Sequence, residues 1–241
     1  MIRLRQTIAM VLAALTFVLA GTAQGAPPRH APAGHARPAA HAWTDTIQTM
    51  PSGSHLIGNP AAKVKLVEFI SYTCPHCAHF NQETLVPLRG AYVRPGKVSV
   101  EVRNLVRDPI DLTVAMLTNC GGAARFLGNH DLFLGTQDRW AALIDKSTDE
   151  QRARWDAGPL ASRLKTIATD FGFYPMMAGR GYSRAQVDTC LADPAMLKRI
   201  VAGTEQAGQA GVNSTPSFMV DGKLTDAHAW AALEPLIKAA L

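Results

Sequence analysis

An almost wholly apolar segment that ends in a pair of cysteines constrains the fold of this chain most. Residues 63–72 read KVKLVEFISY and are rich in β-branched and aromatic side chains. Charged and apolar residues alternate only over the first four positions, and the rest is almost wholly apolar. Such a segment is typical of a central strand covered on both faces. The sequence Cys74-Pro75-His76-Cys77 follows and opens a helix pattern that extends to about Leu88. We therefore expect a buried strand to turn into a helix at the two cysteines.

The order of the later elements predicts an α/β domain. A second strand is expected over 98–106, and a third over 217–220. Between them lies a mostly helical stretch from about 107 to 195, in which Asp111 is a candidate N-cap, and a final helix is expected over about 226–240. This order predicts a helical insertion between the second and third core strands.

The N-terminal residues have the pattern of a secretory signal peptide. Arg3 and Arg5 precede an apolar run from Ile8 to Ala20, and small residues follow before Ala26. The run is shorter than the roughly 20 residues that a comfortable membrane span needs. We expect residues 1–25 to be the signal peptide and the protein to be exported, which in a bacterium places it in the periplasm.

Residues 26–54 are expected to be a flexible tether, and residues 55–241 the folded domain. Residues 26–42 consist of Ala, Pro, His, Arg and Gly, which cannot form a hydrophobic face. His30, His35 and His41 are irregularly spaced there, so we interpret them as part of a solvated spacer.

Charge and cysteine content exclude two classes of protein. The formal net charge is +5, and removal of Arg3 and Arg5 with the signal peptide leaves +3, too little for a dense nucleic-acid-binding surface. Four cysteines in 241 residues are too few for a small disulfide-stapled domain, and a chain of this length can bury a core without them.

The position of Cys74 predicts an acidic thiol. Pro75 suits the first helical position, which makes Cys74 the N-cap residue, with its sulfur beside the free N–H groups of His76 and Cys77. Those donors and the helix dipole favour a thiolate, and a protonated His76 side chain would act in the same direction. We therefore expect Cys74 to be the exposed attacking and leaving sulfur and Cys77 the shielded resolving thiol.

Two other interpretations of this pair remain open. The cysteines could form a structural disulfide, or they could bind a metal together with His79. The metal site lacks an evident fourth ligand, so we predict redox chemistry with no bound metal.

The two remaining cysteines lie near the ends of the helical stretch. Cys120 shares a helix face with Met116 and Leu117, and Cys190 with Val187 and Leu191. In an exported protein they are most simply a second, structural disulfide, and the alternative is two separate buried thiols.

The segment LVEFISYTCPHCAHF, residues 66–80, resembles the active-site segment of the DsbA family of periplasmic thiol–disulfide oxidoreductases. The resemblance covers about residues 55–241 and implies a thioredoxin-like fold. It also implies that Thr215-Pro216 is the cis-proline loop, where the Thr215 backbone binds substrate, and that Glu68 is a buried acid serving Cys77. The alternatives are an ordinary trans proline at Pro216 and a solvent-facing Glu68.

By this resemblance the protein introduces disulfides into unfolded or partly folded exported proteins, and a membrane partner of the DsbB type reoxidises it. No cofactor and no nucleic acid are expected, and a monomer is the default. An isomerase or reductase is the alternative within the same chemistry. A metal-handling protein that binds copper or zinc through its cysteines and histidines is the alternative from another class.

Overall fold

The computed structural model describes residues 42–241. The expected signal peptide and residues 26–41 of the expected tether lie outside this range. Within it, no helix combines the length and apolar character needed to cross a bilayer.

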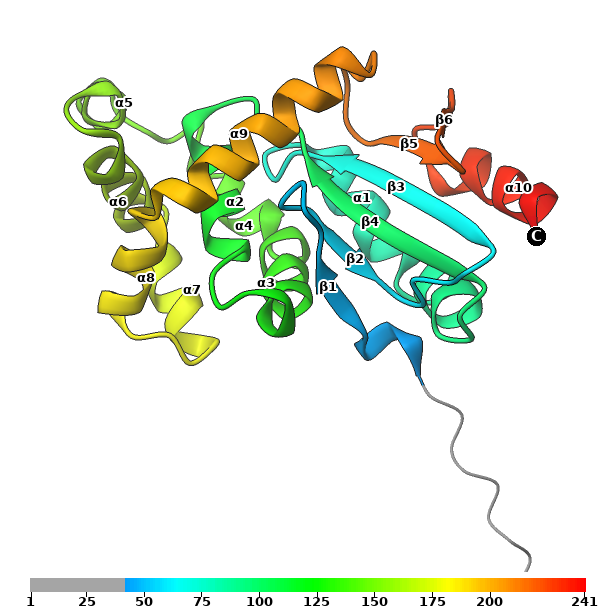
Figure 1. The fold of residues 1–241 in the computed structure, drawn as a ribbon. Coiled ribbons are helices and arrows are strands. Elements are labelled where there is room, and N and C mark those ends of the chain that lie inside the picture. The colour runs from blue at the N-terminus through cyan, green and yellow to red at the C-terminus, as the bar shows by residue number, and fades with distance from the viewer. Residues whose placement is uncertain (1–41) are drawn as a thin grey trace, which may run out of the picture. The chain divides into compact units, whose positions relative to one another are not determined.

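A six-stranded sheet forms the centre of the domain, in the order β1-β2-β4-β3-β5-β6 (Figure 1). Neighbouring strands β3 and β4 run parallel, and every other neighbouring pair is antiparallel. The strands are β1 (Ile47–Thr49), β2 (His55–Ile57), β3 (Val64–Ile70), β4 (Val98–Asn104), β5 (Ser217–Val220) and β6 (Lys223–Leu224).

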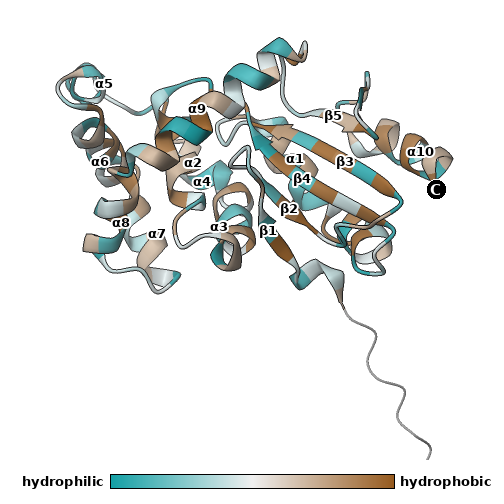
Figure 2. Ribbon diagram, in the orientation of Figure 1, coloured by the Kyte–Doolittle hydropathy of each residue, from teal (hydrophilic) through white to brown (hydrophobic). Residues whose placement is uncertain are grey.

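Strand β3 is buried on both faces, as its near-continuous apolar sequence predicts (Figure 2). Leu66 and Ile70 belong to the large core that also contains Phe80 of α1 (Pro75–Thr84). Val67 and Phe69 pack in a second cluster with Ala207 of α9 (Pro194–Gln209). Helices therefore cover both faces of the strand that leads to Cys74.

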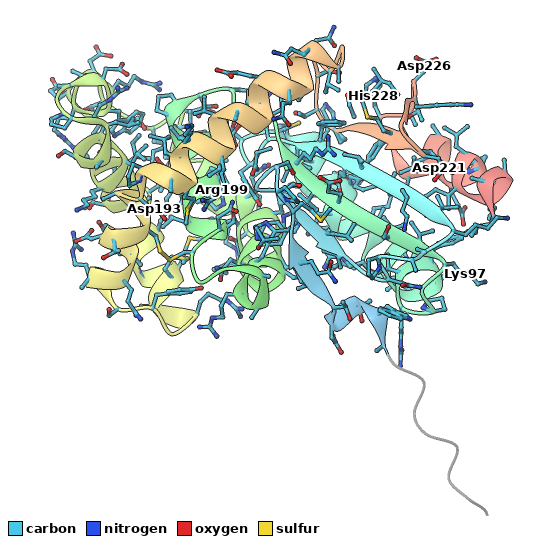
Figure 3. All side chains as sticks on the ribbon, in the orientation of Figure 1. Lys97, Asp193, Arg199, Asp221, Asp226 and His228 are labelled. Atoms are coloured by element: carbon cyan, nitrogen blue, oxygen red, sulfur yellow. A yellow bond between two sulfur atoms is a disulfide. The ribbon has the colours of Figure 1, made fainter. Side chains whose placement is uncertain are left out.

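The helical insertion lies between β4 and β5, the second and third strands that the sequence predicts. It contains α2 (Pro109–Thr118), α3 (Ala123–Gly135), α4 (Gln137–Ala141), α5 (Asp149–Asp156), α6 (Leu160–Asp170), α7 (Phe173–Gly179) and α8 (Arg184–Leu191). Helix α9 then returns the chain to the sheet, with Asp193 capping its first turn (Figure 3). The predicted α/β fold with a helical insertion between the second and third predicted strands is confirmed.

The expected tether is wrong over its last residues. A 3₁₀ turn, η1 (Trp43–Asp45), and strand β1 occupy part of 43–54, and β1 pairs with β2 through Ile47 and Ile57. The three-residue strand has only one apolar side chain, which is too short a pattern to detect in the sequence. The folded part therefore begins near Trp43.

Several helices begin or end at other residues than the sequence predicts. Helix α1 ends at Thr84 rather than Leu88, because Pro87 has no N–H to continue the ladder, and a π-helical turn, η2 (Arg89–Val93), follows. The last helix, α10 (Trp230–Ala240), begins later than expected. Helix α2 is capped by Asp108 and not by Asp111, whose side chain has a different role described below.

Candidate active site

Cys74 lies at the turn from β3 into α1, in the position that the sequence predicts. It is the N-cap residue of α1, with extended backbone angles, and Pro75 occupies the first helical position. As a neutral thiol, Cys74 makes no capping hydrogen bond to the N–H groups of α1 and donates to the carbonyl oxygen of Thr215, 3.2 Å away.

The sulfur of Cys74 is less accessible than expected. Cys74 is only 2% exposed and Cys77 is fully buried, and neither forms a disulfide, so the structure represents the reduced pair. The expectation of an exposed Cys74 is wrong for this state, because Thr215 approaches the sulfur from a distant part of the chain.

Hydrogen bonds lower the pKa of Cys74 to about 5. The bond from the Cys77 thiol lowers the pKa most. The Thr215 side chain and the backbone N–H groups of Cys77 and His76 lower it further, whereas burial opposes these effects. The Thr215 hydroxyl is buried and has no partner when Cys74 is neutral. It is therefore available to donate to the thiolate when that forms.

Cys77 has the opposite environment. Burial raises the pKa of its thiol well above the usual range, and donation to Cys74 and the nearby charge of Glu68 raise it further. The two sulfurs therefore differ strongly in acidity although they lie on adjacent turns of one helix.

The side chain of His76 is exposed to solvent at the start of α1. The N–H group of its backbone is the part of His76 that lowers the pKa of Cys74. The expected contribution of a protonated His76 ring remains a prediction.

Glu68 is buried within the sheet, which excludes a solvent-facing side chain. It pairs with Phe218 of β5, whose ring packs on Phe80 of α1, so Glu68 faces the helix that carries the cysteines. Burial raises its pKa to about 7, and the nearby Arg89 partly opposes this shift. Arg89 forms an ion pair with Asp131 at 2.7 Å.

A small cavity adjoins Glu68 on the α1 side of the sheet. It measures about 20 Å³, enough for one water molecule, and its lining includes Asn81, Arg89 and His130. A carboxyl group with a pKa of about 7 beside a water-sized cavity is suited to exchange a proton during thiol chemistry.

The loop before β5 completes the site. The Thr215–Pro216 peptide bond is cis, and the Pro216 carbonyl accepts a 2.7 Å hydrogen bond from Nδ1 of His228. His228 lies between β6 and α10 (Figure 3). His228 belongs to no motif of the sequence, because its partner in the site is a backbone atom.

Cys120 and Cys190 form a disulfide, with their Cα atoms 5.6 Å apart. It joins the end of α2 to α8, inside the helical insertion. His79 is exposed on α1 and faces Glu83 at 3.9 Å. In residues 42–241, no three His, Cys, Asp or Glu side chains are grouped to hold a metal ion.

Comparison with known proteins agrees with this fold. The sequence model of the thioredoxin family matches residues 51–239. The chain belongs to this family. The expected resemblance to DsbA proteins is confirmed at the level of fold, because alpha-DsbA1 of Wolbachia pipientis matches with a TM-score of 0.58, covering 79% of this chain and 92% of its own. At 20% identity that similarity shows the thioredoxin-like fold alone.

Two other relatives are closer in sequence. A crystal structure described as a protein-disulfide isomerase from Novosphingobium aromaticivorans is 50% identical, with a TM-score of 0.75, over 78% of this chain and 96% of its own. A Rickettsia typhi protein, provisionally named a protein-disulfide oxidoreductase, is 28% identical over 71% of this chain. The thioredoxin-like chain described here covers only 56% of the length of that curated relative.

Proposed function

We propose that this protein is a thiol–disulfide oxidoreductase in which Cys74 and Cys77 alternate between a dithiol and a disulfide. One observation carries the proposal: the pKa of Cys74 is lowered to about 5 while that of Cys77, on the next turn of α1, is raised. An acidic thiol is both the better leaving group and the thiolate at neutral pH, whereas a buried neutral thiol is protected from solvent.

The exchange proceeds in two steps. A substrate thiolate attacks the sulfur of Cys74, the Cys74–Cys77 bond breaks, and Cys77 takes the electron pair and a proton, for which protonated Glu68 is the nearby donor. The second substrate thiolate then attacks the substrate sulfur of the mixed disulfide, and Cys74 leaves as a thiolate. Two electrons pass from the substrate to the cysteine pair, and the substrate gains a disulfide.

The backbone around Thr215 is the proposed binding site for the substrate. Its carbonyl accepts from Cys74 only while that thiol is protonated, and it is free when Cys74 is a thiolate or is bonded to another sulfur. An extended substrate chain can then pair with this backbone as an added strand. Thr215 and Pro216 are therefore proposed to bind substrate through main-chain contacts, with broad specificity.

The direction that the site favours is oxidation of the substrate. Whatever stabilises the Cys74 thiolate stabilises the reduced pair and makes its disulfide a stronger oxidant. We place the activity in the periplasm, because of the signal-peptide pattern of residues 1–25, with exported proteins as substrates and a DsbB-type membrane protein as the reoxidising partner. A monomer is proposed as the working form.

Disulfide isomerisation is the second candidate, favoured by the description of the 50% identical relative. Both candidates use the same two sulfurs, and they differ in what the enzyme does to wrongly paired substrates. Refolding of a scrambled, fully oxidised substrate measures isomerisation, whereas refolding of a reduced substrate measures oxidation.

The deciding experiment is the redox equilibrium of the protein against glutathione. An oxidase is expected to remain reduced over a wider range of glutathione buffers than a reductase with an ordinary thiol. Cys77→Ser is expected to accumulate mixed disulfides with substrate, and Cys74→Ser to abolish exchange. A Cys77→Ser protein that accumulates no adduct, or a wild-type protein that binds copper or zinc tightly without exchanging disulfides, would contradict the proposal.

A further inference from the structure

The three residues between β3 and Cys74 depend on the helical insertion for their polar contacts. Tyr72 is fully buried. Its N–H donates to Oδ1 of Asp111 at 2.7 Å, its carbonyl accepts from Nε2 of Gln137 at 2.6 Å, and its hydroxyl lies 3.1 Å from Nδ1 of His130. Asp111, His130 and Gln137 belong to α2, α3 and α4, three helices of the insertion (Figure 1). Each polar group of Tyr72 therefore meets a different helix.

Gln137 also contacts the proposed nucleophile itself. Its Nε2 donates to the carbonyl of Cys74 at 2.9 Å, in addition to the bond to Tyr72. The Cys74 carbonyl already accepts the first helical bonds of α1, from Cys77 and Ala78. One amide group therefore ties together the backbone on both sides of Thr73 and the first turn of the helix.

The residues that hold the backbone of Tyr72 and Cys74 are buried, and each has a fixed role as donor or acceptor. Gln137 is 4% exposed and Asp111 is fully buried. Asp111 accepts from the backbone and from the Ser71 hydroxyl at 2.6 Å, while Gln137 donates to two carbonyls. Without the Gln137 amide the Cys74 carbonyl keeps its helical donors, but the buried Tyr72 carbonyl is left without one. A buried carbonyl without a donor is unfavourable, so the loop is expected to shift until the Tyr72 carbonyl finds another partner.

Such a shift acts on the sulfur of Cys74. Its pKa is lowered by hydrogen bonds from Cys77, the Thr215 side chain and the first N–H groups of α1, and each of these bonds depends on where the sulfur lies. The elements that carry Thr215 and Cys77 are anchored independently in the sheet and in α1. A change in the backbone of 72–74 therefore moves the sulfur relative to both partners.

We propose that Gln137 is a positioning residue through which the helical insertion sets the dithiol–disulfide equilibrium of Cys74 and Cys77. The proposal rests on the exchange activity proposed above. Gln137 touches neither substrate nor sulfur, and it acts through the backbone of Tyr72 and Cys74. The insertion is in this respect part of the redox centre.

The test compares two substitutions in α4. Gln137→Met keeps the length of the side chain and removes the donor. Trp140→Phe is the matched control, because it removes a buried hydrogen bond from the same helix, from Nε1 to the carbonyl of Phe133 at 2.9 Å, without touching the loop. The measurements are the absorbance titration of the Cys74 thiolate, the glutathione equilibrium and the midpoint of urea unfolding.

Gln137→Met is expected to raise the Cys74 pKa by about one unit and to shift the glutathione equilibrium about tenfold toward the protein disulfide. Trp140→Phe is expected to lower the unfolding midpoint and to leave both redox measurements within about twofold of the wild type. If Gln137→Met changes only the unfolding midpoint, as the control does, Gln137 is a structural residue and the proposal is wrong.

Two further comparisons keep the result interpretable. If Gln137→Met does not fold, Gln137→Leu removes the amide with a smaller apolar side chain, and an unchanged titration in that variant overturns the proposal equally. A wild-type protein that fails to exchange with glutathione contradicts the proposed function, whereas the thiolate titration still tests the positioning role.

Discussion

The Cys74 thiol donates to the carbonyl oxygen of Thr215, 3.2 Å away, although the two residues are 141 positions apart in the chain. The contact joins the start of α1 to the loop that enters β5. Thr215 acts on the pKa of Cys74 in two opposite ways. Its carbonyl accepts the proton of the neutral thiol and so favours the neutral form, whereas its otherwise unpartnered hydroxyl donates to the thiolate and lowers the pKa. The acidity of the sulfur therefore depends on this distant segment as well as on the Cys74–Cys77 motif.

Thr215→Val tests this second contribution. Valine keeps the shape of threonine and removes the hydroxyl, so we expect the pKa of Cys74 to rise from about 5 by roughly one unit, since hydrogen bonds to charged groups are the stronger ones. The thiolate absorbance titration measures the change. Ser214→Ala in the same loop is the control, and equal titrations for the two variants would remove the Thr215 hydroxyl from the site.

His76→Leu is expected to change the same titration less. The ring is exposed, so a positive charge on it is screened by solvent, whereas the His76 N–H that lowers the Cys74 pKa is retained in leucine. We expect a small rise in the Cys74 pKa and a slightly less oxidising disulfide. A rise larger than that of Thr215→Val would show that the ring, and not the backbone, dominates.

Glu68→Gln is expected to alter the pH dependence of stability. Folding raises the pKa of Glu68 from 4.5 to about 7, so the folded state holds this proton more tightly than the unfolded state. The associated stabilisation is complete below about pH 4.5 and is lost as the pH rises through about 7. Glutamine at this position does not titrate, so the unfolding free energy of Glu68→Gln lacks this pH-dependent contribution.

The measurement is made in a Cys74→Ser background, which removes the opposing titration of Cys74. Between about pH 4.5 and 7, the unfolding free energy of the protein with Glu68 is expected to fall by a few kcal/mol relative to that of Glu68→Gln. Asp111, His55 and His130 also have shifted pKa values, but they are present in both proteins and cancel. A difference that stays constant with pH would contradict the assignment.

Replacement of both Cys120 and Cys190 by alanine is expected to lower the free energy of unfolding. The disulfide closes a loop with a sequence separation of 70, for which the chain-entropy estimate is roughly 4 kcal/mol. Urea unfolding of the double variant, in a background in which Cys74 and Cys77 are serine, measures the loss. Reduction of the parent protein in that background is expected to produce the same loss, and no change in either case would mean that the disulfide contributes no stability.

The local sequence predicted the elements whose signals are continuous. The apolar run of β3, the proline that opens α1 and the cysteine spacing were sufficient to place the cysteine pair and to predict that its two thiols differ in acidity. The same reasoning placed the insertion between β4 and β5. It missed β1, whose three residues include a single, half-buried apolar side chain, and it assigned Asp111 to a helix cap that Asp108 provides.

Sequence alone could not determine which distant groups meet Cys74. The N-cap position of Cys74 can be predicted from neighbouring residues, and the helix dipole acts on an N-cap residue wherever the helix lies in the fold. The contacts from Thr215 to the sulfur, from Gln137 to the carbonyl of Cys74 and from Asp111 to the backbone of Tyr72 join segments 39 to 141 positions apart. Tertiary packing decides these contacts. A hydrogen bond needs a donor–acceptor distance of about 3 Å, correct to a few tenths of an ångström, and no residue pattern along the chain encodes that distance.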